Sequence, residues 1–257
     1  MKLIEQDFVI LLLIIVRITG FIYTAPFFSL KNVPFRVKTG LAIFLSIILL
    51  MTVSHEPVEY TSLLAYTVLI VKEVLVGAIM GFFANIAYHI VSFAGQLIDM
   101  EIGFSMVQTL DPMTNIQTTI TSNLYGYLVI LIMLVTKLHH YFLKAIIDSF
   151  QVIPIGKGYL NPNLYQLMMQ FITDYFIIGF RITLPIFAAI LVTNTVLAIL
   201  AKVAPNMNMF VIGLQLKIFV GIFILVLIVE MVPSVADFIF NEMIDMLRAS
   251  VELLIGD

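Results

Sequence analysis

The sequence has very little charge and contains neither cysteine nor tryptophan. Only 11% of its 257 residues are Asp, Glu, Lys or Arg, whereas a soluble domain carries about 25%. This number of charges is too small to cover the surface of a water-soluble globule of this size. The composition therefore disfavours a soluble enzyme or a disordered chain. The absence of cysteine excludes disulfides, thiolate metal sites and a cysteine nucleophile. The 13 basic and 16 acidic residues give a net charge of −3, which argues against nucleic-acid binding.

Apolar side chains dominate what is present. They make up 61% of the chain, and the mean hydropathy is +1.11. A membrane span needs about 20 predominantly apolar residues. Six hydrophobic blocks approach or exceed that length, at 8–28, 37–54, 63–98, 122–150, 164–203 and 210–236. The sequence therefore predicts an all-α integral membrane protein with about six helical segments.

Two of these blocks are too long for a simple span. Blocks 63–98 and 164–203 have 36 and 40 residues. At about 1.5 Å per residue, such helices would reach roughly 54–60 Å, well beyond a hydrocarbon core of about 30 Å. They either fold back as hairpins or project beyond the bilayer and pack on protein. Charged residues inside them favour projection or packing, namely Lys72, Glu73, Asp174 and Arg181.

The first two loops carry an orientation signal. Lys31, Arg36 and Lys38 lie between the first two blocks, whereas 55–62 contains acidic residues and no Lys or Arg. The positive-inside rule therefore predicts a cytoplasmic first loop and an external N-terminus.

Two amphipathic helices are expected outside the six blocks, or overlapping their ends. Residues 137–150 place apolar and polar side chains on separate stripes, and turn residues at 154–158 end that helix. Residues 236–254 form a second such helix. Its acidic residues outnumber Arg248, so we expect it to dock on a protein partner rather than on anionic lipid.

Segment 99–121 interrupts the apolar pattern. It has three acidic residues, five Thr, three Met and no Lys or Arg. Gly103 permits unusual backbone angles, and Pro112 breaks a helix at the preceding residue. Irregular backbone at membrane depth is tolerated where it is buried in protein or lines a wet cavity. One interpretation is a re-entrant constriction sealed by Phe104, Met106, Leu110 and Met113. The other is an ordinary external loop.

Isolated residues leave several alternatives open. Arg17 lies in the first apolar block, where it could mark a pathway, form a structural salt bridge or snorkel to an interface. A proton relay through Glu73, Asp174 and Glu230 is a further hypothesis that no spacing specifies. His139 and His140 are adjacent and point in different directions on a helix, so we expect no metal site and no cofactor.

Small residues and prolines make more definite predictions about helix geometry. Gly77 and Gly81 are four residues apart, a spacing typical of closely packed membrane helices. Pro185 lies inside an apolar block and should kink its helix.

Several motifs occur together, in order and at family spacing, between about residues 8 and 240. They are RITGFIYTAPFFS (17–29), VPFRVKTGLA (33–42), KEVLVG (72–77), AGQLID (94–99), IGFSMVQTLDP (102–112), HH (139–140) and RITLPIFAAILVTNTVLAILAKVAPNMNMFVIGLQLKI (181–218). On these motifs the chain resembles the R subunit of the flagellar type III export gate, the FliR family. It departs from the pattern at Lys137-Leu138, where Asn-Gly is frequent, at Asn206, where Gln is usual, and at Gln215, where Pro is usual.

The resemblance implies a non-enzymatic subunit of a closed, helical gate that passes unfolded flagellar proteins. Its partners would be the P, Q and B subunits and membrane lipid, with no nucleic acid. The assembly would be partly raised out of the bilayer plane, at the bacterial inner membrane and the flagellar basal body. Residues 1–160 would resemble the P subunit, and 161–257 the Q subunit.

The resemblance also assigns roles to individual residues. A pore plug near 103–118 would include Gly103, Phe104, Ser105, Met106, Leu110, Asp111, Pro112 and Met113. Residues important for assembly or structure would be Arg17, Pro26, Pro34, Glu73, Gly95, Gln96, Arg181, Pro185 and Pro205.

Three other functions remain as alternatives at this point. One is the homologous subunit of a virulence type III secretion system, and another is a structural scaffold without a pore. The third is a secondary transporter, which would need an internal inverted repeat. We find no such repeat in the sequence.

Overall fold

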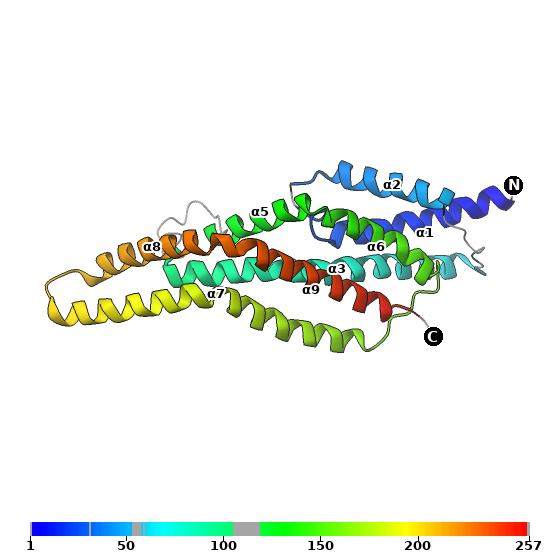
Figure 1. Ribbon diagram of the computed structural model, residues 1–257. Coiled ribbons are helices and arrows are strands. Elements are labelled where there is room, and N and C mark those ends of the chain that lie inside the picture. The colour runs from blue at the N-terminus through cyan, green and yellow to red at the C-terminus, as the bar shows by residue number, and fades with distance from the viewer. Residues whose placement is uncertain (1, 31, 53–57, 59, 105–118, 256–257) are drawn as a thin grey trace. The chain divides into compact units, whose positions relative to one another are not determined.

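The computed structural model describes residues 2–30, 32–52, 58, 60–104 and 119–255, and these residues form helices without strands (Figure 1). The helices are α1 (Lys2–Thr24), α2 (Phe35–Thr52), α3 (Leu63–Ile102), α5 (Ile120–Val135), α6 (Leu138–Val152), α7 (Leu164–Val203), α8 (Met209–Ile228), the short 3₁₀ helix η2 (Val229–Met231) and α9 (Val232–Glu252). Five helical stretches are long and apolar enough to cross a membrane, and a sixth counts if α5 and α6 form one broken span. The predicted all-α membrane class is confirmed.

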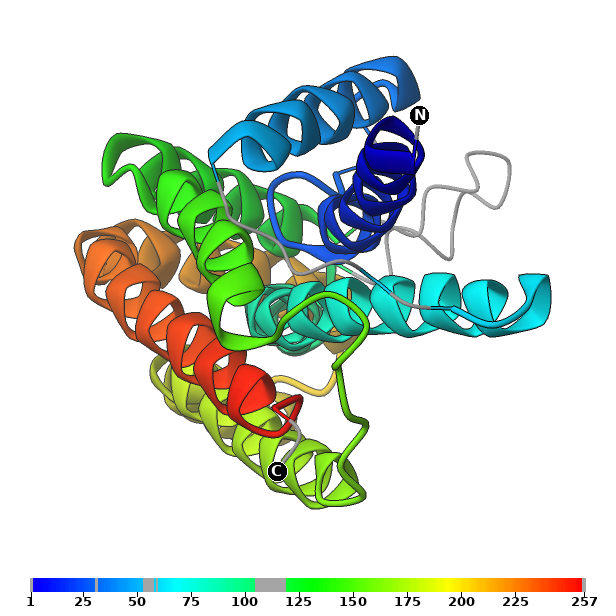
Figure 2. The same ribbon diagram turned by 90° about the vertical axis from the view of Figure 1, so that its right-hand side faces the viewer.

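The chain divides into two compact units that are interleaved along the sequence. Unit 1 consists of Met1–Tyr88, Leu134–Phe171 and Phe240–Asp257, and unit 2 of His89–Met133 and Ile172–Ile239. Helices α3, α7 and α9 each contribute residues to both units. Within unit 1, α1 and α2 run antiparallel beside each other (Figures 1 and 2).

The two long blocks are single helices. Both α3 and α7 contain 40 residues, so a hairpin is excluded for each. Pro185 lies inside α7, and Figure 1 shows this helix bending part-way along. Gly103 ends α3: its φ is 96°, and its N–H donates to the carbonyl oxygen of Asp99 at 3.1 Å. Glycine adopts this left-handed conformation at no steric cost, as predicted.

The first loop is shorter than predicted. Arg36 and Lys38 lie in the first turn of α2 and not in the loop, because Pro34 is compatible with a helix start and its carbonyl accepts from the Lys38 N–H at 3.3 Å. Lys38 is only 9% exposed, and its Nζ lies 5.6 Å from the centre of the Tyr23 ring.

Helices α1 and α3 pack closely through glycines. A Cβ added at Gly77 would collide with the carbonyl oxygen of Arg17, and one at Gly81 would come within 2.8 Å of the α1 backbone. Gly20 contributes from the other helix, because a Cβ there would lie 2.7 Å from the carbonyl oxygen of Val74. The close packing predicted from Gly77 and Gly81 is therefore confirmed.

The two amphipathic helices bury the predicted stripes within the chain itself. In α6 the buried residues include Phe142, Ile146 and Ser149, while His140, Lys144 and Asp148 are exposed. In α9 the buried residues include Phe240, Met243 and Leu247, while Asp237, Asn241, Asp245 and Glu252 are exposed. Helix α9 begins at Val232, because Pro233 is tolerated only in a first turn. The predicted block 210–236 therefore merged the end of one helix with the start of the next.

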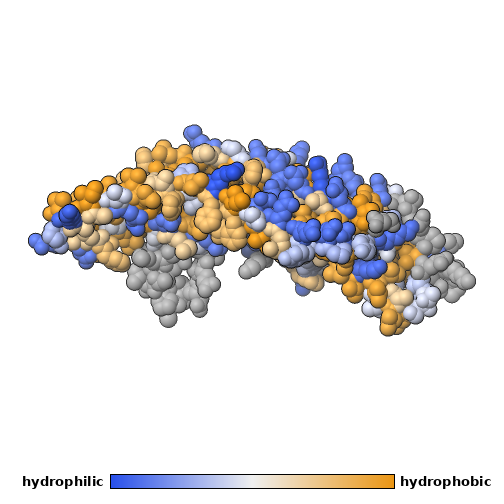
Figure 3. Space-filling model, turned by 90° about the horizontal axis from the view of Figure 1, so that it is seen from below, coloured by the Kyte–Doolittle hydropathy of each residue, from blue (hydrophilic) through white to orange (hydrophobic). Residues whose placement is uncertain are grey.

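Large apolar side chains also lie on the surface. Helix α8 exposes Phe210, Phe219 and Phe223 to between 58% and 72% of their area. One face of the molecule shows broad apolar areas in Figure 3. A soluble monomer rarely exposes large apolar patches, so these surfaces are suited to contact with lipid or other proteins.

Helices α5 and α6 are separated at Lys137, whose backbone is left-handed with a φ of 58°. This conformation is unfavourable for a residue with a Cβ by about 1–2 kcal/mol. Asn and Gly, which are frequent at 137–138 in the resembled family, both tolerate positive φ better than lysine does.

Replacing Lys137 with glycine should raise the free energy of unfolding by about 0.5–1 kcal/mol, because the relief of strain exceeds the added flexibility of the unfolded chain. Thermal unfolding of the purified protein in detergent measures the change. The matched control is Lys144→Gly, in the exposed interior of α6, which should instead lower stability by about 1 kcal/mol. Equal effects at both positions would contradict the role of the backbone angle.

Candidate functional site

Two clusters of contacts stand out, each formed around buried polar side chains within one unit. The arginine centre of unit 1 consists of Arg17, Glu73, Phe150, Ile153 and Gly156. The segment clamp of unit 2 consists of Ser92, Gly95, Asp99, Thr121 and Ser122. Buried polar groups are expensive without partners, so their contacts indicate what each group does.

The arginine centre is built on a two-pronged ion pair. Arg17 on α1 and Glu73 on α3 are both fully buried. Arg17 donates from Nε to Glu73 Oε2 at 2.5 Å and from Nη2 to Oε1 at 3.1 Å. Two parallel hydrogen bonds of this kind fix both distance and orientation. The pairing is possible because Gly77, one turn after Glu73 on the same face of α3, allows α1 to approach.

The remaining groups of the centre come from the chain around the end of α6. Arg17 Nη1 donates to the carbonyl oxygen of Ile153 at 2.8 Å, and its guanidinium carbon lies 4.3 Å from the centre of the Phe150 ring. The Gly156 N–H donates to Glu73 Oε1 at 2.8 Å. The centre thus joins α1, α3 and the turn after α6. Of the alternatives for Arg17, the structural salt bridge is confirmed.

The segment clamp joins the last turn of α3 to the first turn of α5. Asp99 is fully buried, and the Thr121 N–H lies 3.2 Å from each of its carboxylate oxygens. The Thr121 hydroxyl also donates to Asp99 Oδ1. A carboxylate is stabilised at this position because the first N–H groups of α5 lack partners within their helix and the helix dipole is positive there.

Neighbouring contacts fix the register of α3 against α5. The hydroxyl oxygens of Ser92 and Ser122 are 2.9 Å apart. Gly95 faces Ser122 so closely that an added Cβ would collide with the Ser122 backbone. Gln96 is exposed, and its side-chain amide is 3.5 Å from the Ser92 hydroxyl. The clamp therefore brings together the residues where segment 103–118 leaves α3 and where the chain re-enters α5.

The predicted plug residues lie mostly outside the described part of the chain. Gly103 and Phe104 are described, and Phe104 is half-buried. The other six lie outside the described residues: Ser105, Met106, Leu110, Asp111, Pro112 and Met113. Their role as a seal stays a prediction.

The predicted assembly residues are dispersed. Arg17 and Glu73 meet in the arginine centre, and Gly95 belongs to the segment clamp. Pro26 lies in the turn after α1, where its carbonyl accepts from the Phe28 N–H at 2.8 Å, and Pro205 follows the end of α7. Arg181 is exposed on α7. In the parts of the chain that the structure describes, no cluster of three His, Asp or Glu side chains could hold a metal ion.

Comparison with known proteins gives these features a context. Residues 8–243 match the family described as bacterial export proteins, family 1. The flagellar biosynthetic protein FliR of Bacillus subtilis (strain 168) is 31% identical over 250 residues, which cover 95% of each chain. The chain belongs to the FliR family.

Other FliR proteins agree with this assignment. The FliR protein of Escherichia coli (strain K12) is 28% identical over 233 residues, covering 91% of this chain and 89% of the relative. That of Aquifex aeolicus (strain VF5) is 29% identical over 231 residues, covering 88% of each. Membership in the FliR family identifies a subunit of the flagellar type III export gate, and its apolar helices make it a multi-pass membrane protein.

Sequence reasoning missed several residues of these groups. Thr121 was placed at the end of the polar segment 99–121 and Ser122 at the start of the block 122–150, although the first N–H groups of a helix need acceptors such as a carboxylate. Gly20 went unnoticed, although its spacing of four residues from Thr24 matches the small-residue pattern seen at Gly77 and Gly81. The partners of Arg17 had no local signal, because Glu73 is 56 residues away.

Proposed function

We propose that this protein lines part of the export pore through which unfolded flagellar subunits pass, and that it has no catalytic activity. Its membership in the FliR family supports this proposal. We place it in the bacterial inner membrane at the flagellar basal body. Its partners there are the P, Q and B subunits of the gate.

We propose that segment 103–118 plugs this pore at rest. The observation that carries the proposal is the segment clamp. Because Asp99 accepts hydrogen bonds from Thr121, the polar segment starts and ends at one place instead of bridging distant helices. A segment tethered at both ends can obstruct a channel and still deform when a substrate enters.

The chemistry of the segment suits a deformable seal. Phe104, Met106, Leu110 and Met113 are large apolar residues in a stretch that also contains Ser, Gln, Thr, Asn and Asp. Methionine side chains repack at little energetic cost, so they can close around an empty pore and yield to an unfolded polypeptide.

We also propose that residues 1–160 correspond to a P-like part and 161–257 to a Q-like part of the assembly. The exposed acidic residues of α9, such as Asp237 and Asp245, are available for a basic partner because the apolar stripe of this helix is already buried. Broad apolar surfaces on α8 provide further area for subunit contacts.

Replacing Phe104, Met106, Leu110 and Met113 together with serine should raise the leak of small ions across the membrane by an order of magnitude or more. Deleting 104–113 should have the same effect, with assembly intact. The leak is measured as ion flux in cells that express the complete gate, or in liposomes that contain it.

The matched control replaces four exposed apolar residues elsewhere with serine, at Met51, Leu63, Val203 and Met207. This control should leave the leak unchanged. An unchanged leak in the plug variants, with normal recovery of the complex, would reject the seal and favour an ordinary external loop.

A further inference from the structure

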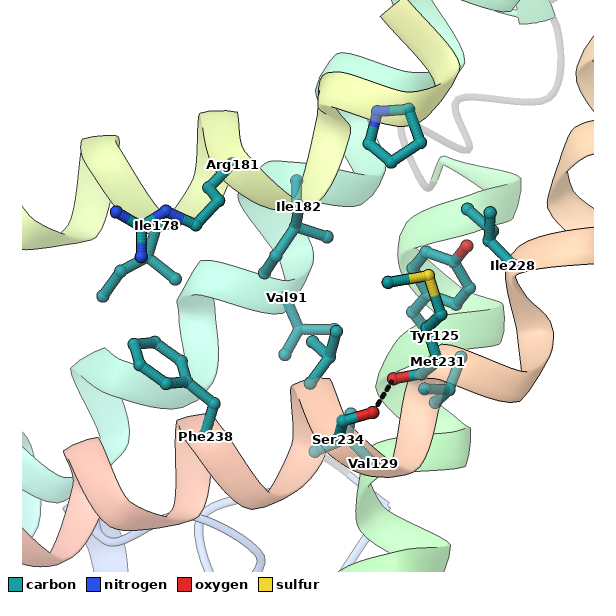
Figure 4. A pocket seen from close by; sticks show the side chains of 14 residues that line it. Val91, Tyr125, Val129, Ile178, Arg181, Ile182, Ile228, Met231, Ser234 and Phe238 are labelled. Carbon is teal, nitrogen blue, oxygen red and sulfur yellow. Dashed lines mark hydrogen bonds between the residues drawn. The ribbon is translucent and has the colours of Figure 1, made fainter.

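Unit 2 contains a pocket that belongs to neither the arginine centre nor the segment clamp. Its volume is about 270 Å³, and α3, α5, α7, α8, η2 and α9 all contribute to its walls. Figure 4 shows Val91, Ile182 and Phe238 converging on the cavity from three helices. Every lining residue lies within unit 2.

Two irregularities in the surrounding helices account for this space. Pro185 lines the pocket from inside α7, where it removes one helical hydrogen bond and its ring displaces the preceding turn. Met231 lines it from η2, the short 3₁₀ stretch between α8 and α9. Both residues therefore stand where the regular helical geometry around the pocket is locally altered.

The walls of the pocket are almost entirely hydrocarbon. Val91 and Val129 are only 3% and 1% exposed, and Ile178 is 6% exposed. Among the polar groups, the Ser234 hydroxyl is already engaged, since it donates to the carbonyl oxygen of Met231 at 3.2 Å (Figure 4). Apolar walls of this kind favour an apolar occupant.

One cation lies at the edge of this apolar space. Arg181 lines the pocket from α7, is exposed, and extends beside Ile178 in Figure 4. Within the described residues, no carboxylate or other acceptor lies within hydrogen-bonding distance of its guanidinium. A guanidinium stays charged, and a charge within a membrane-spanning helix is costly unless it finds a partner.

We propose that this pocket binds one acyl chain of an anionic phospholipid, whose phosphate pairs with Arg181. Such a lipid supplies hydrocarbon for the walls and an anion for the cation in one molecule. Arginine binds phosphate through two parallel hydrogen bonds, and basic pockets between membrane helices hold anionic head groups. The volume lies just below the range of about 300–1,000 Å³ of whole small-molecule sites, which suits a single chain.

Other ligands would match either the charge of Arg181 or the apolar cavity, but not both. Free phosphate would pair with Arg181 and leave the cavity between Val91 and Val129 unfilled. A carboxylate from a partner subunit would do the same. A zwitterionic lipid would fill the cavity but would offer Arg181 a weaker net attraction. The two features together therefore favour an anionic lipid.

The full-length protein, purified in mild detergent, is the material for the test. It is incubated with phosphatidylglycerol, with phosphatidylcholine of the same acyl chains, or with inorganic phosphate, and bound molecules are counted by native mass spectrometry. One phosphatidylglycerol should remain bound, with an affinity at least about tenfold above that of phosphatidylcholine, as a charge-assisted hydrogen bond predicts. Inorganic phosphate should not be retained.

Two variants separate the parts of the site. Arg181→Gln should lower phosphatidylglycerol binding at least about tenfold and remove the preference over phosphatidylcholine. Val235→Phe, which fills the pocket from α9, should abolish binding of both lipids. The matched controls are Arg36→Gln and Val226→Phe, which alter exposed residues outside the pocket and should bind like the parent protein.

Several results would overturn the proposal. Equal affinity for the two lipids would do so, as would full binding by Arg181→Gln or Val235→Phe. Retention of inorganic phosphate alone would indicate a simple anion site. A partner carboxylate cross-linked to Arg181 in the purified gate, with no phospholipid present, would assign the cation to subunit contact. If the variants do not fold, the comparison of the two lipids on the parent protein still tests the proposal.

Discussion

Replacing Glu73 with glutamine should lower the free energy of unfolding by about 3–5 kcal/mol, the usual effect of removing one partner from a buried ion pair. The shape of the side chain is nearly unchanged, and its oxygen can still accept from the Gly156 N–H. What is lost is the negative charge that compensates Arg17, a fully buried cation. The loss is measured by thermal unfolding of the purified protein in detergent and by the yield of folded protein from the membrane.

A double variant shows whether charge is the cause. Replacing Arg17 with methionine and Glu73 with leucine removes both charges and leaves side chains of similar volume, which is often tolerated in buried pairs. The double variant should recover only part of the stability that Glu73→Gln loses. The Ile153 carbonyl and the Gly156 N–H then lose their partners, each at about 1–3 kcal/mol.

The matched control for charge loss is Arg36→Gln at an exposed position, which should change stability by no more than about 0.5 kcal/mol. The account of the arginine centre fails if Glu73→Gln is as stable as the parent protein. It also fails if the double variant is less stable than each of the Arg17→Met and Glu73→Gln single variants.

Replacing Gly77 with alanine should destabilise the protein by about 3 kcal/mol, at the upper end of the usual range for overpacking. The new methyl group would collide with the carbonyl oxygen of Arg17. Because this methyl group is fixed to the α3 backbone and meets the α1 backbone, no side chain can rotate away, and α1 must move from α3. That movement would also lengthen the hydrogen bonds between Arg17 and Glu73.

The chain offers a glycine that should behave in the opposite way. Gly40 lies in α2, and no atom lies within 4 Å of a Cβ added there. Gly40→Ala should therefore stabilise the protein by about 0.5–1 kcal/mol, because alanine is the better helix former. The difference in sign between Gly40→Ala and Gly77→Ala is measured as a shift of the unfolding midpoint. The same sign at both positions would show that helix propensity, and not contact, dominates at Gly77.

The architecture was largely predictable because it depends on local properties of the sequence. Apolar runs of sufficient length indicated the spans, and the full extent of α7 was predicted at 164–203. Charges within long blocks correctly favoured unbroken helices. The exceptions lie at helix boundaries, where a single residue determines where a helix begins. Pro34 starts α2 before the basic residues expected in the loop, and Pro233 starts α9 inside a run that hydropathy treats as continuous.

The site was less predictable because its contacts are long-range. Hydropathy identified Arg17 as unusual but gave no indication that Glu73 was its partner. It also gave no indication that Asp99 would cap α5 by accepting hydrogen bonds from Thr121. A pattern of small residues predicted that Gly77 lies at a crossing, while the identity of the crossing helix depends on the packing of the whole unit.

The interleaving of the two units has a consequence for how the protein is made. Unit 1 includes Met1–Tyr88 and also Phe240–Asp257, and the Tyr159 N–H donates to the carbonyl oxygen of Leu254 at 3.0 Å. All of unit 2 has been synthesised once translation reaches Ile239. Unit 1 is complete only after residues 240–257 have been synthesised, although it also includes residues 1–88. A chain that stops after Ile239 therefore contains all of unit 2 but leaves unit 1 without the segment that contacts Tyr141 and Tyr159.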